Sequence, residues 1–442
     1  MENMINKFWN RNRIVLKSFW IGFLILVLLI PTLLIGNLVS ERQERQHQAV
    51  AEVSSRWAGP QIVTGPVIGI PYLETVSDNN GSSKHEKRWA WFMPAKLDIT
   101  AHVTPEKRYR GIFQVIVYTT ELQVRCHYDS LHLQELGLSA DKLLWSEAAV
   151  FVDLSDLQGL KEELSLRLDT HTGGTDLDLV PGKYSTDQFK NALSATLPAW
   201  LPTASQGPLE FSATVKIKGT GTLSFVPAGR ETRVEATSAW PDPSFTGSSL
   251  PDIRTIKDSG FVADWRVLAL NRNFPQQWKG NTFDLAGAAF GVNLIVPVDA
   301  YQQTTRCVKY AVLIIVLTFT AFFLLEWVYQ RPIHSLQYLL VGFALCLFYT
   351  LLLSFSEYIG FASAYAVAAI ATIGLITWYV GSMLRSGKTS VFIGAQLSVQ
   401  YGFVYTLIQL QDYALLMGSV GLFITLALVM YFSRKIKWQQ DR

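Results

Sequence analysis

Apolar residues are concentrated in two parts of the chain, residues 18–39 and 308–433, and a more polar block of about 270 residues separates them. A helix needs roughly twenty consecutive apolar residues to cross the hydrocarbon of a bilayer. The turns between such helices must lie near water, because backbone polar groups exposed to lipid are costly. Runs of this length predict six transmembrane helices, at residues 18–39, 309–328, 335–355, 360–382, 390–410 and 413–433.

The block at residues 40–307 has a different period. Short β-branched and aromatic runs alternate with polar positions and are separated by Gly, Pro, Asp and Asn, which is typical of strands. Ten or more such runs without regular helices between them predict antiparallel sheets packed as a sandwich. Helical periodicity is limited to residues 129–137, 156–165 and 185–195, the last with Ser185 or Thr186 as its N-cap. Residues 77–88 have the composition of an exposed, mobile hairpin loop.

The first apolar segment follows four basic residues, Lys7, Arg11, Arg13 and Lys17. This arrangement is similar to a secretory signal peptide, but the apolar part is too long and no small-residue cleavage site follows it. We therefore expect an uncleaved signal anchor. The polar sequence after it predicts that the helix continues to about Trp57, and Pro31 is tolerated in a transmembrane helix.

Basic residues alternate between the predicted connections. They occur on one side of the membrane in four clusters: before the first span, at Arg331 and His334, at Arg385 and Lys388, and in the tail at Arg434, Lys435 and Lys437. The other two connections carry Glu357 and Asp412 instead. The positive-inside rule then places the termini, residues 1–17 and 434–442, in the cytoplasm and the polar block outside. Arg306 and Lys309 oppose this assignment, but the four clusters outweigh them.

These patterns together predict an α+β membrane protein. It has a six-helix transmembrane bundle and a large, antiparallel β-sandwich-like extracytoplasmic domain inserted between helices 1 and 2. Charged residues make up 17% of the chain, below the roughly 25% of a soluble domain, which agrees with a membrane protein. The net charge of +3 does not favour nucleic acid as a partner.

The three cysteines, Cys126, Cys307 and Cys346, have no metal-binding spacing. A Cys126–Cys307 disulfide is conceivable in an oxidising compartment, and isolated structural thiols are the simpler interpretation.

The polar block offers few candidates for chemistry. Nucleophile elbows, zinc-protease motifs, P-loops and dinucleotide fingerprints are absent from the sequence, and we expect no catalytic residue, metal or cofactor. His127, Asp129 and His132 could contribute to a metal site, but solvated histidines at the end of a strand are commoner. The aromatic residues Trp89, Trp91, Tyr109 and Tyr118 could line a sugar-binding face or could simply fill the core.

Polar residues within the apolar segments are the better candidates for function, namely Glu357, Asp412, Gln396, Gln400, Tyr349 and Tyr405. Gln396 and Gln400 are four residues apart and share one helix face. Glu357 and Asp412 sit at the ends of spans, where a carboxylate avoids most of the cost of burial in lipid. They could form the outer mouth of a substrate or proton path, or they could be interfacial caps and helix–helix hydrogen bonds.

Several long segments resemble the CreD family of inner-membrane proteins, also called cell envelope integrity proteins. They include RWAGPQIVTGPVIGIPY (56–72), AWPDPSFTGSSLPDIRTIKDSGFVADWRVLALNRNFPQ (239–276), HSLQYLLVGFALCLFYTLLLSFSEYIGFASAY (334–365) and YGFVYTLIQLQDYALLMGSVGLFITLALVMYFSRKIKW (401–438). The resemblance implies a multi-pass protein of the bacterial inner membrane with a periplasmic domain. It also implies a link to a two-component envelope or β-lactam response and to colicin tolerance. It supplies no reaction.

Three functions follow as hypotheses. The first is a non-enzymatic envelope-maintenance protein whose periplasmic domain docks onto periplasmic or inner-membrane partners. The second is a transporter or flippase with a path through the third to fifth spans. The third is a peptidoglycan- or carbohydrate-processing enzyme that uses carboxylates such as Asp153, Glu235 or Asp264. The lipid bilayer is a partner in all three, and the sequence leaves the oligomeric state open.

Overall fold

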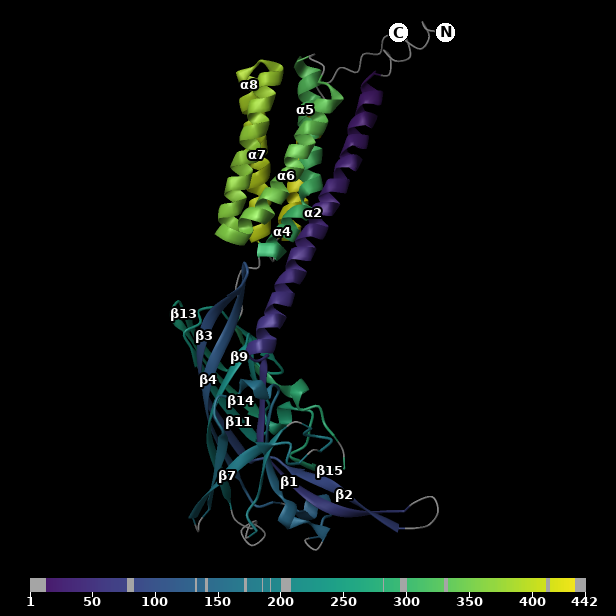
Figure 1. Ribbon diagram of the computed structural model, residues 1–442. Helices are drawn as coiled ribbons and strands as arrows, with labels where there is room; N and C mark the ends of the chain where they lie inside the picture. Colours follow the sequence, from purple (N-terminus) through teal and green to yellow (C-terminus); the bar gives the residue numbers. More distant parts are fainter. Residues whose placement is uncertain are drawn as a thin grey trace. The chain divides into compact units, whose positions relative to one another are not determined.

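The structure is a computed structural model that describes residues 13–77, 83–131, 133–139, 142–170, 173–184, 186–190, 192–199, 208–280, 282–294, 300–329, 333–410 and 414–433 (Figure 1). The chain divides into two compact units. The helical unit is formed by Met1–Gln46 and Val298–Arg442, and the sheet unit by His47–Pro297. Each unit has a hydrophobic core of its own.

The helices lie in the predicted apolar segments. They are α2 (Arg13–Trp57), α4 (Ala300–Lys309), α5 (Ala311–Tyr329), α6 (Ser335–Ile359), α7 (Phe361–Leu384), α8 (Gly387–Gln409) and α9 (Ala414–Ser433). Among the described residues, α2, α6, α7 and α8 are long and apolar enough to cross a membrane, and α4 with α5 makes a fifth candidate. That count does not include α9, which covers most of the sixth predicted segment.

Helix α2 continues to Trp57 as predicted, with Pro31 inside it. In the helical unit, α2 packs closely against α6 at Gly342. A Cβ atom placed on Gly342 would lie 2.2 Å from Leu28 Cδ1, so only glycine allows this approach without a shift. The fully buried Leu28 and the Thr32 hydroxyl, 3.8 Å from Cys346 Sγ, extend the same contact.

The second predicted span differs from the structure at its start. Helices α4 and α5 are bent by 40° at a break next to Tyr310. The amphipathic α4 carries Arg306 and Lys309 in its last turn and buries Tyr301, Thr304 and Cys307. Residues 300–307, which the sequence pattern assigns to the polar block, are therefore helical.

Among the described residues, the sheet unit has sixteen strands in a single hydrogen-bonded arrangement. They are β1 (Gln61–Ser77), β2 (Ser83–Phe92), β3 (Lys96–Arg110), β4 (Phe113–Tyr128), β5 (Ala149–Leu154), β6 (Leu164–Thr170), β7 (Gly173–Pro181), β8 (Leu193–Thr196), β9 (Leu209–Thr220), β10 (Thr222–Phe225), β11 (Glu231–Ser238), β12 (Pro243–Gly247), β13 (Ile253–Lys257), β14 (Gly260–Leu268), β15 (Gln277–Lys279) and β16 (Phe290–Leu294). The order is β12-β16-β10-β1-β5-β8-β7-β6-β9-β4-β3-β11-β14-β13, with β2 paired to β1 and β15 to β2.

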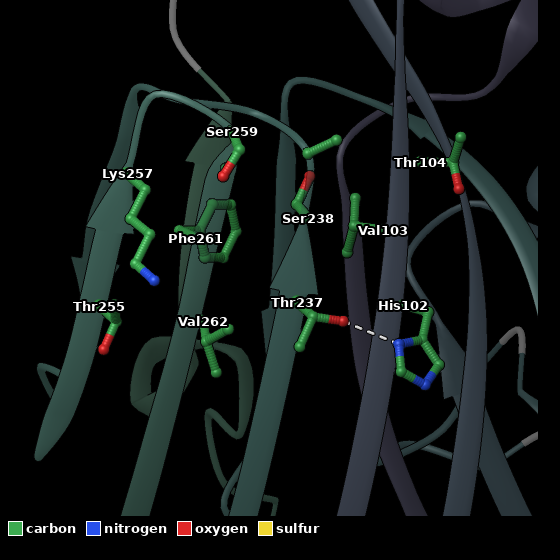
Figure 2. A pocket seen from close by; sticks show the side chains of 12 residues that line it. His102, Val103, Thr104, Thr237, Ser238, Thr255, Lys257, Ser259, Phe261 and Val262 are labelled. Carbon is green, nitrogen blue, oxygen red and sulfur yellow. Dashed lines mark hydrogen bonds between the residues drawn. The ribbon is translucent and has the colours of Figure 1, made fainter.

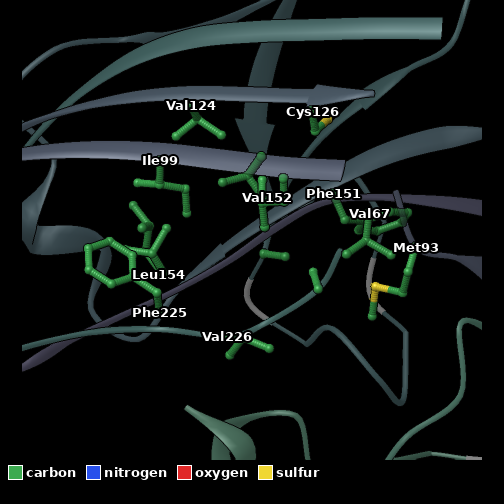
Figure 3. Packing of buried hydrophobic residues seen from close by; sticks show 14 of the residues in the cluster. Val67, Met93, Ile99, Val124, Cys126, Phe151, Val152, Leu154, Phe225 and Val226 are labelled. Atoms are coloured by element: carbon green, nitrogen blue, oxygen red, sulfur yellow. The ribbon is translucent and has the colours of Figure 1, made fainter. Parts of the chain in front are cut away.

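Most strand pairs are antiparallel, as predicted, but β1 with β10 and β3 with β11 are parallel. Strand β7 pairs with both β6 and β8 and so joins two groups of strands into one sheet. Figure 3 shows the buried side chains of β1 and β5, such as Val67 and Phe151, gathered with Ile99 and Val124 of β3 and β4. The sheet thus folds around one hydrophobic core.

The three helical predictions in this block are wrong. Residues 156–165 contain one 3-10 turn, Leu157–Gly159, before β6 begins, because Leu160 pairs with Ile217 instead of continuing a helix. The described part of 129–137 contains only the 3-10 turn Leu133–Leu136.

In 185–195, Ser185 lies outside the described residues, and the Thr186 hydroxyl accepts a hydrogen bond from Phe189 N (2.9 Å) in a local turn. The bends there place Phe189 4.8 Å from Trp91 between ring centroids. Burial of this ring outweighs the weak helical preference of the segment.

Candidate functional site

Glu357 is held by two residues at the end of α6. Tyr301 of α4 donates a hydrogen bond to Glu357 Oε1 (2.9 Å), and Arg42 Nε of α2 lies 3.8 Å from the same oxygen. Only 8% of the Glu357 side chain is exposed, against 41% of Arg42. A carboxylate in the last turn of a helix is unfavourable next to the negative end of the helix dipole, and Arg42 offsets that charge. We call Glu357, Arg42 and Tyr301 the Glu357 cluster.

Glu326 of α5 has the same kind of surroundings. Lys17 of α2 forms an ion pair with Glu326 Oε1, and Tyr338 of α6 donates a hydrogen bond to its Oε2 (3.3 Å). Lys17 Nζ also donates to the carbonyl of Ile333 (2.9 Å). We call Glu326, Lys17 and Tyr338 the Glu326 cluster. As in the Glu357 cluster, a cation of α2 and a tyrosine hydroxyl hold a carboxylate in the last turn of another helix.

The two clusters are far apart along α2. Lys17 and Arg42 are separated by 25 residues of continuous helix, which corresponds to about 37 Å. This length exceeds the roughly 30 Å of a hydrocarbon core and is shorter than the 40–45 Å of a bilayer with its headgroups. The spacing therefore suits two charged clusters at the opposite interfaces of one membrane.

The buried Gln400 of α8 is paired within the helical unit, where Thr318 of α5 donates a hydrogen bond to its Oε1 (3.2 Å). Gln400 also lines a cavity of about 20 Å³ with Leu313, Phe403 and Gly421. This volume is enough for one water molecule. Gln396 is half-buried, and its Oε1 has no hydrogen-bond partner among the described residues.

Tyr349 and Tyr405 belong to an aromatic cluster formed by α6, α7 and α8. Phe348 contacts Tyr349, Tyr365 and Tyr401 at ring-centroid distances of 4.9, 5.3 and 4.5 Å. Tyr405 lies 5.1 Å from Tyr365. The Tyr365 hydroxyl donates to the carbonyl of Tyr401 (2.7 Å). Within the described part of the chain, the buried hydroxyls of Tyr349 and Tyr401 have no such partner. Asp412 lies outside the described residues.

The candidates of the sheet unit do not form one site. His127 Nε2 lies 3.4 Å from Asp129, His132 is outside the described residues, and no three metal-binding side chains converge among those described. Trp91 and Tyr118 are buried in the core, and Trp89 packs against it, while Tyr109 is exposed. The core interpretation therefore holds for these three rings and not for Tyr109.

The carboxylates considered for catalysis are also separated. Glu235 and Asp264 are directly opposite each other on β11 and β14, on the outer face of the sheet. Asp153 belongs to β5 in the other group of strands. Partial burial raises the pKa of Asp153 to about 6. The structure thus brings together two of the three carboxylates.

A cleft of about 520 Å³ lies on the outer face of β3, β11, β14 and β13 (Figure 2). His102 Nδ1 and Thr237 Oγ1 are hydrogen-bonded at 2.7 Å within it, and Thr255, Lys257 and Ser259 add polar groups. Neither Glu235 nor Asp264 lines this cleft.

All three cysteines are free and buried, so the predicted alternative of isolated thiols holds and the Cys126–Cys307 disulfide does not form.

Sequence reasoning missed the Glu326 cluster and both cations that contact the carboxylates. One signal was present, because Glu326 is an acidic residue inside the apolar run of α5. An ionisable residue in such a run is a functional or structural candidate by default. The identity of its partner could not be found in this way, since Lys17 is 309 residues away in the sequence.

Comparison with known proteins agrees with this architecture. A family model described as inner membrane protein CreD matches residues 13–439. Inner membrane protein CreD of Escherichia coli (strain K12) is 31% identical over 421 residues, which cover 94% of this chain and 91% of that protein. With the apolar helices, these matches support a multi-pass inner-membrane protein. The chain belongs to the CreD family of inner membrane proteins.

Proposed function

We propose that this protein is a non-enzymatic component of the bacterial cell envelope that supports envelope integrity. In this proposal six helices anchor it in the inner membrane, both termini are cytoplasmic, and the sheet unit lies in the periplasm. There the sheet unit docks periplasmic or inner-membrane partners during an envelope or β-lactam stress response, and colicin tolerance is a second expected phenotype.

The observation that supports the anchor role is the environment of Glu357. Its carboxylate is almost fully buried, accepts a hydrogen bond from Tyr301 and forms an ion pair with Arg42. Gln400 is likewise paired with Thr318, beside a cavity large enough for a single water. Polar side chains that hold helices together in this way favour a packed anchor over an open path.

The orientation is tested with alkaline phosphatase fusions, because this enzyme is active only outside the cytoplasm. A fusion after Asp78 should be active and a fusion after Lys388 inactive. The reverse pattern would overturn the proposed orientation.

The role of the carboxylates is tested in a deletion strain under envelope stress. Glu357→Gln keeps a side chain that can accept the Tyr301 hydrogen bond but removes the charge, and Asp412→Asn is its counterpart at the other tip. Under the anchor proposal both variants protect as well as the parent chain when their abundance is matched. Loss of protection at normal abundance would instead support a path that needs these charges.

The transport alternative has one observation in its favour. The buried hydroxyls of Tyr349 and Tyr401 lack a hydrogen-bond partner within the described part of the helical unit, and such groups are costly unless water or a solute binds them. Tyr349→Phe and Tyr401→Phe separate the two possibilities. In a packed anchor each change leaves protection unchanged and keeps or raises thermal stability. A transport path predicts loss of protection without loss of abundance.

A further inference from the structure

Helix α4 of the helical unit presents one polar stripe on its outer side. Gln302, Arg306 and Lys309 are four and then three residues apart, a spacing that places them on one face of a helix. Gln302 and Lys309 are exposed and Arg306 is half-buried, whereas the opposite face of α4 is buried in the helical unit. We call Gln302, Arg306 and Lys309 the α4 stripe.

The two cations of the α4 stripe lack a countercharge. Within the described part of the chain, neither Arg306 nor Lys309 forms an ion pair. Carboxylates at the same end of the helical unit are already engaged, since Glu357 is held in its own cluster and Glu41 pairs with Arg45. Two cations one helical turn apart repel each other unless an anion lies between them. The α4 stripe therefore suits an anionic ligand.

Contacts within the helical unit fix the level of α4 along α2. Tyr301 and Arg42 meet at the Glu357 carboxylate. Closer to the middle of the unit, a Cβ atom placed on Gly36 would lie 3.9 Å from Val308 Cγ1. These two contacts are six residues apart on α2 and seven on α4, which is about 10 Å of helix in both cases. The two helices therefore run antiparallel beside each other at this level (Figure 1).

This level is the end of the apolar segment of α2. The segment ends at Val39, between the two contacts. Counted from the contact at Gly36, the Cα atoms of Arg306 and Lys309 lie about 2–6 Å inside that end. Side chains on a helix point toward its N-terminus, which for α4 is the end at Glu357. Long cationic side chains near the end of a span extend to the headgroups in this way.

Cations at this end stand apart from the other basic residues of the helical unit. Arg385 and Lys388 lie at the Lys17 end, because α6 leads away from that end and α7 leads back to it. Positive charges at both ends weaken the charge asymmetry that orients a membrane protein. A pair of cations on one face at the Glu357 end is accounted for if the pair binds an anion there.

We propose that the α4 stripe binds the headgroup of an anionic phospholipid in the leaflet at the Glu357 end. Arg306 donates hydrogen bonds to the phosphate oxygens, Lys309 adds a second positive charge, and Gln302 hydrogen-bonds the polar headgroup. The exposed Val312, three residues beyond Lys309, offers an apolar surface to the acyl chains. The level of the stripe at the end of the apolar segment favours a lipid over a dissolved phosphate. The proposal concerns the helical unit alone and does not depend on the envelope role.

Lipid binding is measured by native mass spectrometry on the full-length protein after detergent has removed bound lipid. Phosphatidylglycerol and phosphatidylcholine with the same acyl chains are added back separately. The parent chain should bind the first phosphatidylglycerol more tightly than the first phosphatidylcholine, on the order of tenfold. Arg306→Gln with Lys309→Gln should remove most of this preference and leave the binding of phosphatidylcholine unchanged. Soluble glycerol phosphate should not compete, because it lacks acyl chains.

The matched control is Arg254→Gln with Lys257→Gln, which removes the same residue types at the same spacing from exposed positions of β13 in the sheet unit. This control should keep the preference for phosphatidylglycerol. The exchange Arg306→Lys with Lys309→Arg retains both charges and should keep it too, which separates loss of charge from loss of fold. An unchanged preference in the Gln variant of α4 would overturn the proposal, and so would an equal loss in the control. Competition by glycerol phosphate would overturn the assignment to a lipid.

Discussion

In the helical unit, Glu326 and Glu357 are the residues with the clearest physical roles. Both carboxylates lie in the last turn of a helix, where the helix dipole disfavours a negative charge. Both accept a tyrosine hydroxyl and face a cation from α2. Sequence reasoning selected Glu357 because it lies between two apolar runs. It missed Arg42 and Tyr301, since nothing in their local sequence indicates which carboxylate they meet.

The Glu326–Lys17 pair should contribute measurably to stability. Glu326→Gln leaves Lys17 without its countercharge at a site where 23% and 15% of the two side chains are exposed. We expect a loss of about 1–3 kcal/mol in the free energy of unfolding. Thermal unfolding of purified protein measures this loss. The double change Lys17→Gln with Glu326→Gln should recover part of it, and strict additivity of the two single changes would contradict a direct pair.

Asp153 gives a pH-dependent prediction for the sheet unit. Its pKa of about 6 in the folded protein is above the ordinary 3.8 because burial disfavours the charged form. The folded state therefore binds the proton of Asp153 more tightly than the unfolded state does. The ionised carboxylate destabilises the fold fully above pH 6, and this destabilisation decreases as the pH falls toward 3.8. Asp153→Asn should raise the free energy of unfolding at pH 7.5 by up to about 3 kcal/mol. Thermal unfolding would show this gain as a higher unfolding temperature. The gain should shrink at pH 5. A gain that is independent of pH would contradict this explanation.

At the scale of elements, periodicity predicted the apolar helices and most strands well and the short helices of the block poorly. Long apolar runs have few alternatives in a membrane, whereas segments such as 185–195 are short enough for burial of one ring to decide their conformation. The bend between α4 and α5 was also not predictable, because it depends on packing of Tyr301 and Cys307 within the helical unit.

The contact between α2 and α6 can be tested through its glycine. Gly342→Ala places a methyl group against the fully buried Leu28, and we expect a loss of about 1–3 kcal/mol from overpacking. Gly374 on α7 is the matched control, because a Cβ atom there meets no other atom within 4 Å. Gly374→Ala should be neutral or should stabilise the helix by up to about 1 kcal/mol. Circular dichroism of unfolding in detergent measures both variants. Equal changes in stability for Gly342→Ala and Gly374→Ala would show that the close approach of α2 and α6 is unimportant.

At the scale of the whole molecule, two units with separate cores are built from one chain. The sheet unit depends on pairs that are distant in sequence, such as β1 with β10 and β3 with β11. The helical unit brings the N-terminal helix together with helices more than 250 residues later. Its association depends on a few polar contacts and on close packing, because lipid gives helices no hydrophobic reason to associate.

The thiols report on both cores at once. Cys126 is buried in the sheet unit, and Cys307 and Cys346 are buried in the helical unit. A maleimide reagent should label almost none of them in the native protein and all three after denaturation without a reductant. Labelling of only one thiol after denaturation would indicate a disulfide and contradict the structure.

The sequence by itself determined the membrane character, the position of the apolar helices, the β-rich nature of the block and the family resemblance. These follow from composition and from local periodicity, which a helix or strand expresses residue by residue. Only the tertiary structure decided which partners hold Glu326 and Glu357 and that the three cysteines stay free. Such features depend on contacts between residues that are tens to hundreds of positions apart in the sequence. A local sequence pattern carries no information about which of these distant residues come into contact.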